Sequence, residues 1–340
     1  MHKTAAANLA IVGATGAVGR EFAGLLAQRA FPVKTCRFLA SERSAGQGIA
    51  GAGGTATVEP LSPTSFDGID LAFFSAGKTV SRTFAPLARQ AGAVVVDNSS
   101  AFRMDPAVPL VVPEVNPRAV RAHNGLIANP NCSTIILAVV LWPLQRRCRI
   151  RRVVVATYQA ASGAGARAQA ELEEQTRAVL AGGPAIPQVF PVPCAFNVFS
   201  HNSPIGPDGY NEEETKVVAE MRKIFGDESL RIAPTCMRVP VLRAHTEAIS
   251  VEFNEPFDEH EARTVLSDAP GLRVVDDRVA NDFPTPLAAS GQDEVLVGRI
   301  RQDASVPDQR GLQLLCSGDQ LRKGAALNAI QIAELLRRDE

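Results

Sequence analysis

Short apolar runs alternate with segments of helical periodicity over the first 130 residues. The run Asn8–Val12 ends at Gly13, and residues 20–30 then carry apolar side chains at helical spacing. The chain is therefore expected to begin with a strand, a glycine turn and a helix. Repetition of this unit favours a parallel, doubly wound sheet. The further strand-like runs lie at 36–40, 71–74 and 93–97, with a helical segment at 79–90.

The pattern changes after about residue 150, where strand candidates become longer and a second, α+β domain is expected. The segment 321–338 predicts an amphipathic helix that packs back on the first domain. Domains are thus expected at 1–132, joined by 320–340, and at 133–319, while GIAGAGGTA (48–56) is expected to be a loop. The strand candidates of the second domain are RVVVATYQAAS, TEAISVEFN, EVLVGRIRQD and GLQLLCSGD, and its helices are expected near 166–180, 211–225 and 258–267.

Composition points to a globular protein with a small-molecule partner. Of 340 residues, 46% are hydrophobic and 21% charged, and 35 basic against 36 acidic residues give a net charge of -1. This balance offers no broad electrostatic attraction for nucleic acid or an anionic membrane. The longest apolar stretch, 135–142, is far shorter than the roughly 20 residues that span a bilayer. The opening MHKTAAANLAIVG passes directly into a glycine motif, so a signal peptide is not expected.

The six cysteines are scattered, with no CxxC pair and no Cys/His spacing typical of zinc. Neither a disulfide framework nor a metal site is indicated, and a reducing, cytoplasmic location fits this usage.

The motif GATGAVG places Gly13, Gly16 and Gly19 directly after an apolar strand and at the start of a helix. Such glycines let backbone N–H groups approach a pyrophosphate, whose charge the helix N-terminus favours. Glycines also simply make tight turns, so the strand-turn-helix context is what favours dinucleotide binding.

The identity of the dinucleotide is expected to depend on Ser41-Glu42-Arg43-Ser44, after the second strand. Arg43 between two hydroxyls makes a suitable cradle for the 2′-phosphate of NADP. Glu42 keeps NAD open, because an acidic residue here can hold a free ribose hydroxyl. A solvated polar turn is the third reading of this stretch.

The stretch NPNCST places Cys132 between a proline-set turn and an apolar helix that begins at or just after it. A thiol at a helix N-terminus is more reactive, because the dipole and free N–H groups stabilise its thiolate. Cysteine is also often a buried core residue, and position alone does not separate the two readings.

Three other polar residues stand out. Gln159 ends a strand candidate before a glycine-rich turn, and Arg238 and His245 lie seven residues apart. With Cys132 they would form a site only if the fold brings these stretches together. A structural histidine and an arginine held in an ion pair are the alternatives.

Ten motifs in order, from about residue 8 to 338, together resemble aspartate-semialdehyde dehydrogenase. Many motifs in register are more specific than any one of them. They are GATGAVG, SERSAGQ, FFSAG, DNSSAFRMD, VPEVN, NPNCST, YQAASGAG, GYNEEETK, RVPVLRAHTE and LRKGAALNAIQIAE.

The resemblance implies a Rossmann-like N-terminal domain and a C-terminal α+β catalytic and dimerisation domain, as in glyceraldehyde-3-phosphate dehydrogenase. It implies a cytoplasmic homodimer that reversibly converts L-aspartate 4-semialdehyde, phosphate and NADP+ to 4-aspartyl phosphate and NADPH, at the branch toward lysine, methionine, threonine and diaminopimelate. By motif, Cys132 is the nucleophile, His245 the acid/base, and Gln159 orients the covalent intermediate.

The implied substrate ligands are Arg103 and Lys216 for phosphate, with Asn131 nearby, Arg238 for the α-carboxylate and Glu213 for the amino group. No metal site is implied. The cofactor-binding residues implied by the resemblance are Gly13, Thr15, Gly16, Ala17, Val18, Ser41, Arg43, Ser44, Ser75, Gly77, Ser162, Gly163 and Asn328.

The sequence departs mildly from the family pattern. Ala244 and Thr246 flank His245 where a Gly-His-Ser run is expected, and Gly318-Asp319-Gln320 stands where Asp-Asn is expected. N-acetyl-γ-glutamyl-phosphate reductase is the nearest rival, but its acylated substrate has no ammonium for Glu213. A catalytically silent dinucleotide-binding protein is the rival from another class, and the presence of Cys132 and His245 argues against it.

Overall fold

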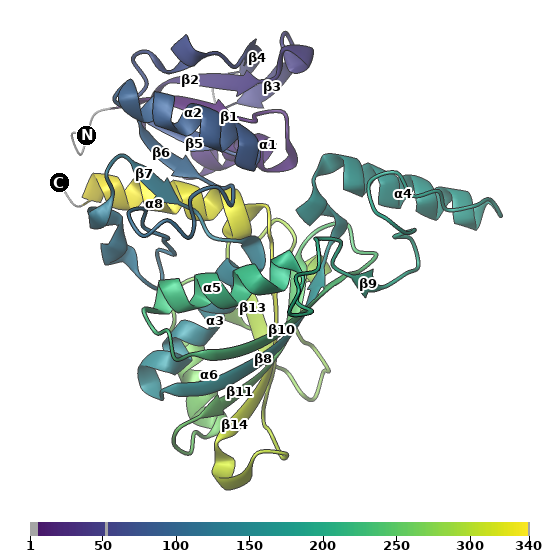
Figure 1. Cartoon of the computed structure of the whole chain (residues 1–340). Coiled ribbons are helices and arrows are strands. Elements are labelled where there is room, and N and C mark those ends of the chain that lie inside the picture. The colour runs from purple at the N-terminus through teal and green to yellow at the C-terminus, as the bar shows by residue number, and fades with distance from the viewer. Residues whose placement is uncertain (1–5, 52–53, 339–340) are drawn as a thin grey trace. The chain divides into compact units, whose positions relative to one another are not determined.

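The computed structural model describes residues 6–51 and 54–338, which form two compact units (Figure 1). One unit comprises the described residues up to Asn131 together with those from Ala325 onward, and the other runs from Cys132 to Gly324. Residues 1–5, where a signal peptide would begin, residues 52–53 of the expected loop, and residues 339–340 lie outside the description. The α/β class, with a Rossmann-like unit and an α+β unit, is confirmed.

The nucleotide-binding unit, as we call residues 6–131 and 325–338, is built on a parallel sheet with one antiparallel hairpin. Its strand order is β3-β4-β2-β1-β5-β6-β7, and β1 pairs parallel with both β2 and β5. The order therefore reverses at β1, which is the doubly wound topology that the sequence predicts. The strands are β1 (Ala7–Val12), β2 (Val33–Ala40), β3 (Gly48–Gly51), β4 (Gly54–Pro60), β5 (Leu71–Phe74), β6 (Val94–Asp97) and β7 (Leu126–Ala128).

The loop expected at 48–56 is wrong. This stretch forms β3, which pairs antiparallel with β4, and β4 pairs parallel with β2. Ile49 and Val58 are buried in the core of the unit. The sheet edge offers hydrogen bonds and these two side chains supply apolar contact, which together outweigh the weak strand propensity of glycine and alanine.

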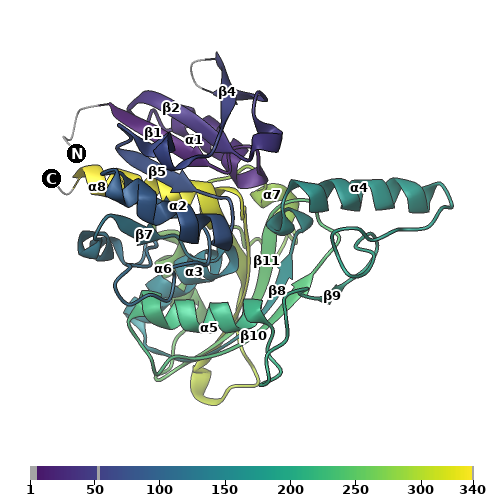
Figure 2. The ribbon, with the colours of Figure 1, turned by 45° about the horizontal axis from the view of Figure 1, so that its top comes forward.

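Three helices cover this sheet: α1 (Ala17–Gln28), α2 (Lys78–Gln90) and α8 (Leu327–Arg338). α8 packs beside α1 (Figure 2). The two helices share one buried cluster with β1, through side chains such as Ile330 and Phe22. The helix expected over 321–338 is only partly correct, because residues 322–326 form a π-helical turn before α8. The Gly324 N–H bonds the carbonyl of Asp319, five residues back, and the Asp319 carboxylate accepts the N–H of Leu321.

The catalytic unit, as we call residues 132–324, holds a mixed sheet of order β12-β13-β14-β11-β8-β10-β9. Helices α3, α5 and α6 pack on one face of it (Figure 1). The strands are β8 (Ile150–Gln159), β9 (Phe199–Ser200), β10 (Arg231–Arg238), β11 (His245–Phe253), β12 (Leu272–Val274), β13 (Val295–Gln302) and β14 (Gly311–Gly318), and the helices are α3 (Cys132–Arg147), α4 (Ala166–Leu180), α5 (Glu212–Phe225), α6 (Glu259–Ser267) and α7 (Pro286–Ala289).

The sequence pattern does not predict β10, which contains Pro234. Proline cannot donate to a sheet and argues against a central strand. In the described chain, β9 pairs with β10 only at Met237 and Arg238, so the outer side of β10 is open at Pro234. The missing N–H is therefore tolerated, and β10 lies parallel to β8 over its whole length.

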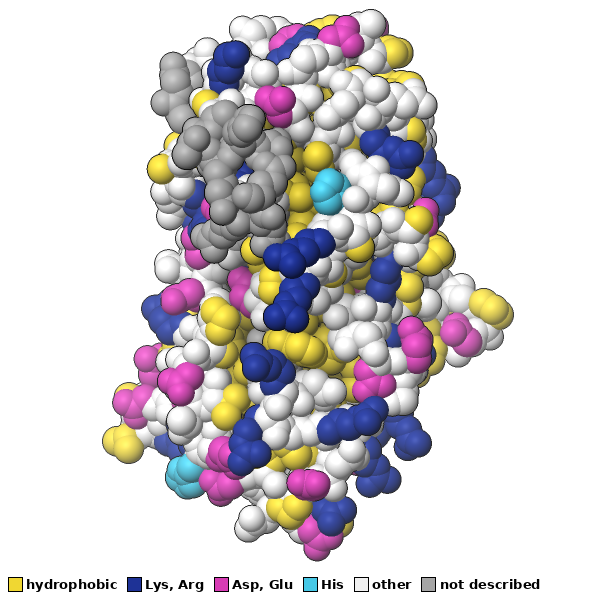
Figure 3. Space-filling model, turned by 90° about the vertical axis from the view of Figure 1, so that its left-hand side faces the viewer, with side chains coloured by type: hydrophobic (Ala, Val, Ile, Leu, Met, Phe, Trp, Pro, Cys, Tyr) yellow, Lys and Arg dark blue, Asp and Glu magenta, His cyan; other side chains and the backbone are white. Residues whose placement is uncertain are grey.

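Side chains of both charges are interspersed on the face drawn in Figure 3, in keeping with the net charge of -1. Within residues 6–51 and 54–338, we find no helix that is both apolar and long enough to traverse a bilayer.

Candidate active site

Cys132 is the first residue of α3, as the sequence predicts. Its side chain is half-buried, and its Sγ lies 3.4 Å from Nε2 of His245. Gly324 packs against it, because a Cβ added to that glycine would lie 3.0 Å from the Cys132 Cβ. The thiol is therefore held at a helix start, beside an imidazole and a glycine that leaves it room.

His245 begins β11 and is fully buried. The Ala160 N–H donates a 3.0 Å hydrogen bond to its Nδ1. In a neutral imidazole the proton then sits on Nε2, which faces the Cys132 sulfur. Burial, with smaller contributions from Arg238 and His201, holds the pKa of His245 well below its usual value, so the ring is neutral.

Gln159 is the last residue of β8. Its Nε2 donates hydrogen bonds to Ser133 Oγ at 3.1 Å and to Glu213 Oε1 at 3.3 Å. The amide thus ties the first turn of α3 to the first turn of α5.

Arg238 ends β10 and is only 2% exposed. Its Nη1 donates to the Ala160 carbonyl at 2.7 Å, and its Nη2 lies 2.9 Å from Nε2 of His201. Its Nε–H has no hydrogen-bond partner among the described residues. Burial is the main cause that lowers the pKa of the guanidinium. A buried donor without a partner indicates a place for a ligand acceptor.

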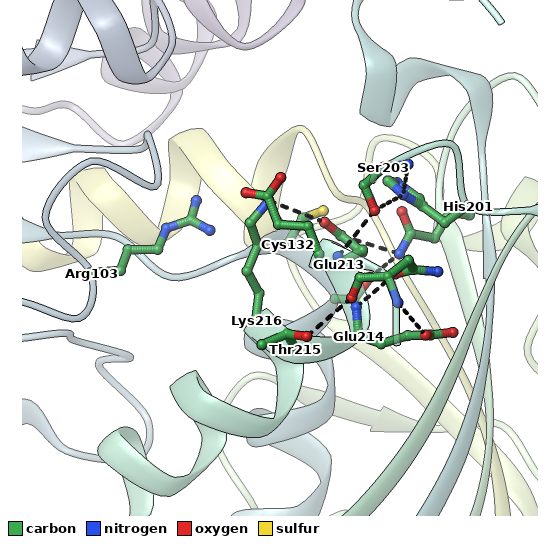
Figure 4. A network of polar contacts seen from close by, with 12 residues as sticks. Arg103, Cys132, His201, Ser203, Glu213, Glu214, Thr215 and Lys216 are labelled. Carbon is green, nitrogen blue, oxygen red and sulfur yellow. Dashed lines mark hydrogen bonds and ion pairs between the residues drawn. The ribbon is translucent and has the colours of Figure 1, made fainter. Parts of the chain in front are cut away.

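Glu213 and Lys216 come from the first turns of α5 (Figure 4). Asn211 is the N-cap of this helix: its side chain accepts the N–H of Glu214, while the Glu214 carboxylate accepts the N–H of Asn211. The Lys216 ammonium lies 3.1 Å from Glu212 and 3.8 Å from Glu213. The capping box therefore presents one carboxylate and one ammonium at the same helix end.

Strand register explains why these distant residues meet. β8 and β10 run parallel, and Gln159 is the register partner of Arg238. β11 runs antiparallel to β8, so its first residue, His245, lies at the carboxyl end of β8. One end of the sheet thus gathers Gln159, Arg238 and His245, and α3 and α5 add Cys132 and Glu213. The assembly that the sequence left conditional is present.

The glycine turn of the nucleotide-binding unit has the geometry that a phosphate cradle needs. Gly13 has φ +85°, and an added Cβ would lie 2.4 Å from the Ser75 carbonyl oxygen. A Cβ on Gly19 would lie 2.2 Å from the Gly13 carbonyl oxygen. Gly16 is the N-cap of α1, with no side-chain cap bond. The helix begins with Ala17 and Val18, and Thr15 comes just before its N-cap. The free N–H groups of the first helical turn form the positive end of the helix dipole.

The other cofactor residues of this unit lie after the strands that flank β1. Ser41, Arg43 and Ser44 belong to an exposed or half-exposed turn after β2, and Ser75 and Gly77 follow β5. Because β2, β1 and β5 are parallel neighbours, their carboxyl ends share one edge of the sheet. That edge, at the reversal of strand order, is where doubly wound sheets bind ligands. These residues fit a dinucleotide.

The remaining predicted residues fall in different places. In the nucleotide-binding unit, Arg103 donates hydrogen bonds to the carbonyls of Asn129 and Asn98. Asn131, the residue just before α3, is buried. Asn328 is fully buried and donates to Val111 and Asn129.

In the catalytic unit, Gln320 bonds the buried Ser162 hydroxyl. Gly163 packs on the catalytic pair, since its added Cβ would lie 3.0 Å from His245 Cε1.

Sequence reasoning missed three polar residues near the cluster: His201, Ser203 and Glu247. Glu247 could have been found, because it occupies the inward side of β11 together with Ile249 and Val251, which is an exception to period-two alternation. His201 and Ser203 lie in a polar stretch that carries no such signal.

The departure at Ala244 has a structural consequence. Its φ is +71°, the left-handed region that favours glycine. The backbone is held there by an N–H bond of 2.8 Å to Gln320. The glycine expected from the family pattern is thus explained by the backbone conformation just before His245.

Most of the chain matches known semialdehyde dehydrogenases. Residues 8–123 match the semialdehyde dehydrogenase NAD binding domain, and residues 141–323 match the semialdehyde dehydrogenase dimerisation domain. The chain is 54% identical over 328 residues to aspartate-semialdehyde dehydrogenase of Synechocystis, covering 96% of each chain.

Two solved structures extend the likeness. Aspartate semialdehyde dehydrogenase II of Vibrio cholerae, complexed with ASA, is 44% identical with a TM-score of 0.96, covering 99% of each chain. The enzyme of Candida albicans with NADP is 25% identical with a TM-score of 0.76, covering 98% of each chain. This chain belongs to the aspartate-semialdehyde dehydrogenase family.

Proposed function

We propose that the protein reversibly oxidises L-aspartate 4-semialdehyde to 4-aspartyl phosphate, with phosphate and NADP+, through a thioester on Cys132. The observation that carries this proposal is the 3.4 Å approach of the Cys132 sulfur to the buried imidazole of His245, at the start of α3. A semialdehyde complex of the Vibrio cholerae relative supports the substrate class.

The Cys132 thiol loses its proton to solvent, and the thiolate adds to the aldehyde carbon to give the oxyanion of a thiohemiacetal. The helix dipole and the His245 Nε2–H stabilise the thiolate before attack. Because Nδ1 accepts the Ala160 N–H, we propose His245 as a neutral hydrogen-bond donor, first to the sulfur and then to the substrate oxygen, in place of the acid/base role that the family resemblance implies. Bound NADP+ supplies the hydride acceptor for the step to the thioester.

Phosphate then attacks the thioester carbon, and the Cys132 thiolate leaves with the His245 N–H again beside it. Arg103 and Lys216 are the proposed phosphate ligands, with Asn131, because a dianion needs cationic donors. Gln159, fixed by Ser133 and Glu213, orients the thioester.

Arg238 and Glu213 recognise the α-amino acid head group. The partnerless Nε–H of Arg238 suits a carboxylate oxygen, and Glu213 suits an ammonium. An acylated nitrogen carries no charge for Glu213, which disfavours the N-acetylated substrate of the rival reductase.

NADP is the proposed cofactor. The glycines at 13, 16 and 19 leave space and N–H groups for a pyrophosphate, and Arg43 is placed at the edge where a 2′-phosphate would lie. NADP in the Candida albicans relative agrees with this choice.

A homodimer through the catalytic unit is proposed as well. The sheet face opposite α3 and α5 leaves Val154 37% and Tyr158 36% exposed. Large exposed apolar side chains on one sheet face suit contact with a second copy, and this unit matches the dimerisation domain. Sedimentation of the wild type and of Val154→Arg tests this: the wild type is expected as a dimer and the variant as a monomer.

The reaction is tested by following NADPH formation with purified protein, L-aspartate 4-semialdehyde and NADP+, with and without phosphate. We expect turnover only with phosphate, and a loss of roughly three orders of magnitude or more in Cys132→Ser, because an alcohol of high pKa cannot replace the thiolate. Cys148→Ser, at a half-buried thiol outside the cluster, is the matched control and should keep wild-type turnover. Phosphate-independent turnover, or an active Cys132→Ser enzyme, would contradict the proposal.

A further inference from the structure

His201 links the two groups proposed to hold the substrate head group. It follows β9, where its N–H donates to the Cys236 carbonyl at 2.8 Å. On one side of its ring, Nε2 lies 2.9 Å from Arg238 Nη2. On the other side, Nδ1 lies 3.1 Å from the Ser203 hydroxyl (Figure 4).

The ring is neutral, which fixes the direction of these bonds. Burial, with a smaller contribution from the neighbouring Arg238, lowers the pKa of His201 to about 4, although the Glu213 carboxylate raises it. A guanidinium can only donate, so Nε2 accepts from Arg238. The ring proton then sits on Nδ1 and is donated to Ser203 Oγ. The Ser203 backbone N–H, 3.3 Å from the same nitrogen, finds no acceptor there in this tautomer.

Ser203 continues the link to α5. Its Oγ accepts the backbone N–H of Glu213 at 3.1 Å. A continuous chain of hydrogen bonds therefore runs from the Arg238 guanidinium through His201 and Ser203 to the backbone of Glu213. It joins the end of β10 to the first turn of α5, two elements that are separate in sequence.

We propose that His201 and Ser203 are positioning residues that hold Arg238 and Glu213 at the spacing of an α-carboxylate and an α-ammonium. This inference rests on the proposed function of the site. It adds how the site fixes the separation of the two side chains that bind the amino acid head group. Arginine is long and loses rotamer freedom when it is held, so a fixed acceptor on Nη2 preorganises the donor Nε–H. Without this bridge the two charges would still be present, but their separation would not be set.

Variants of His201 test the two arms of the bridge separately. Glutamine places an amide near the position of Nε2 and keeps an acceptor for Arg238, whereas asparagine places it near Nδ1 and keeps only the Ser203 contact. Leucine keeps neither contact, and Ser203→Ala removes the second arm alone. His260→Gln is the matched control, because the His260 side chain is 80% exposed on α6.

The readout is KM for the semialdehyde, measured beside KM for phosphate and NADP+ and beside the melting temperature. We expect His201→Leu to raise KM for the semialdehyde roughly 10-fold or more, as for loss of a hydrogen bond to a charged group. His201→Asn should resemble the leucine variant, His201→Gln should recover most of the loss, and KM for phosphate and NADP+ should not change. A parallel rise in all three constants, or equal values for Gln and Asn, would mean that His201 only supports the fold.

Binding of L-homoserine, measured by calorimetry, separates this inference from the reaction itself. This alcohol carries the same head group and no aldehyde for Cys132. Absence of turnover in the wild type would overturn the proposed reaction, yet homoserine binding that is lost in His201→Leu and kept in His201→Gln would still support the bridge. Failure of the wild type to bind homoserine would overturn the bridge. If the leucine variant does not fold, the Gln, Asn and Ser203→Ala variants decide by the same criteria.

Discussion

The glycine turn of the nucleotide-binding unit and the cluster around Cys132 achieve function in opposite ways. The turn uses consecutive residues and backbone N–H groups, and its requirement is space: Cβ atoms at Gly13 and Gly19 would lie 2.4 and 2.2 Å from carbonyl oxygens. The cluster uses side chains from five separate segments, brought together by the register of β8, β10 and β11. The glycine turn can therefore be predicted from a short motif, whereas the cluster around Cys132 depends on the fold.

The two regions also differ in what they bury. The catalytic unit holds Arg238 at 2% exposure, His245 at 0% and Glu213 at 6%. Buried polar groups cost free energy unless they are paired, and the Arg238 Nε–H has no partner in the described chain. Functional sites commonly carry such a stability cost. The turn places no charged side chain in the core.

Among variants that leave the reacting groups themselves unchanged, Gly163→Ala has the largest expected effect, because it inserts a methyl group into the cluster. The added Cβ would lie 3.0 Å from His245 Cε1 and 3.1 Å from Arg238 Nη1, so both must move. We expect kcat to fall roughly 10- to 100-fold, since small misplacements of catalytic groups are costly. A rise in KM for NADP+ with unchanged kcat would instead favour the cofactor role that the family resemblance gives to Gly163.

Many elements of the fold and several residues of the cluster can be predicted from the sequence alone. Periodicity predicts β1, β5, β6, α4, α5 and α6 and the doubly wound sheet. It fails at β3 and β4, where sheet pairing overrides glycine-rich composition, and at β10, where an open edge tolerates Pro234. Cys132, Gln159, Arg238 and His245 stand out as polar residues in marked positions. His201 and Ser203 do not, because their importance comes from contacts across the fold.

Arg43→Ala tests the role of the exposed turn after β2 in the nucleotide-binding unit. Arg43 is exposed in the turn after β2 and is proposed to bind the 2′-phosphate. We expect Kd for NADP+ to rise roughly 10-fold with little change for NAD+, as for loss of a charge-assisted hydrogen bond. Equal losses for both dinucleotides, measured by fluorescence titration, would mean that this stretch is only a turn.

Glu247→Gln tests the protonation state of the buried Glu247 carboxyl group in the catalytic unit. Neither carboxyl oxygen of Glu247 has a hydrogen-bond partner among the described residues, and burial raises its pKa well above the usual value. Above about pH 4.5 the unfolded chain loses this proton while the native state keeps it, so stability falls as pH rises, until the native pKa is passed.

The glutamine variant should lack this slope, which amounts to about 1.4 kcal/mol per pH unit. Urea unfolding at several pH values, at fixed protein concentration, measures it. Glu252→Gln, which only breaks the partly exposed pair with Arg152, is the control. Parallel stability profiles for wild type and Glu247→Gln would show that Glu247 is ionised in the native protein.

The smallest effect comes from two glycines of the nucleotide-binding unit that have no role in the turn. Gly24 lies on the exposed side of α1, and Gly92 follows α2; both are exposed, and an added Cβ meets nothing within 4 Å at either. They differ in backbone conformation, because φ at Gly92 is +94° whereas Gly24 is helical.

Gly24→Ala should therefore stabilise the protein by about 0.5–1 kcal/mol, since alanine loses less backbone entropy in a helix. Gly92→Ala should destabilise it by about 1 kcal/mol, because the left-handed region is strained for any residue with a Cβ. Urea unfolding of both variants beside the wild type measures the pair, and turnover should be unchanged in each. Because contacts and exposure are matched, a shift of the same sign in both would show that local backbone conformation does not decide what a glycine contributes here.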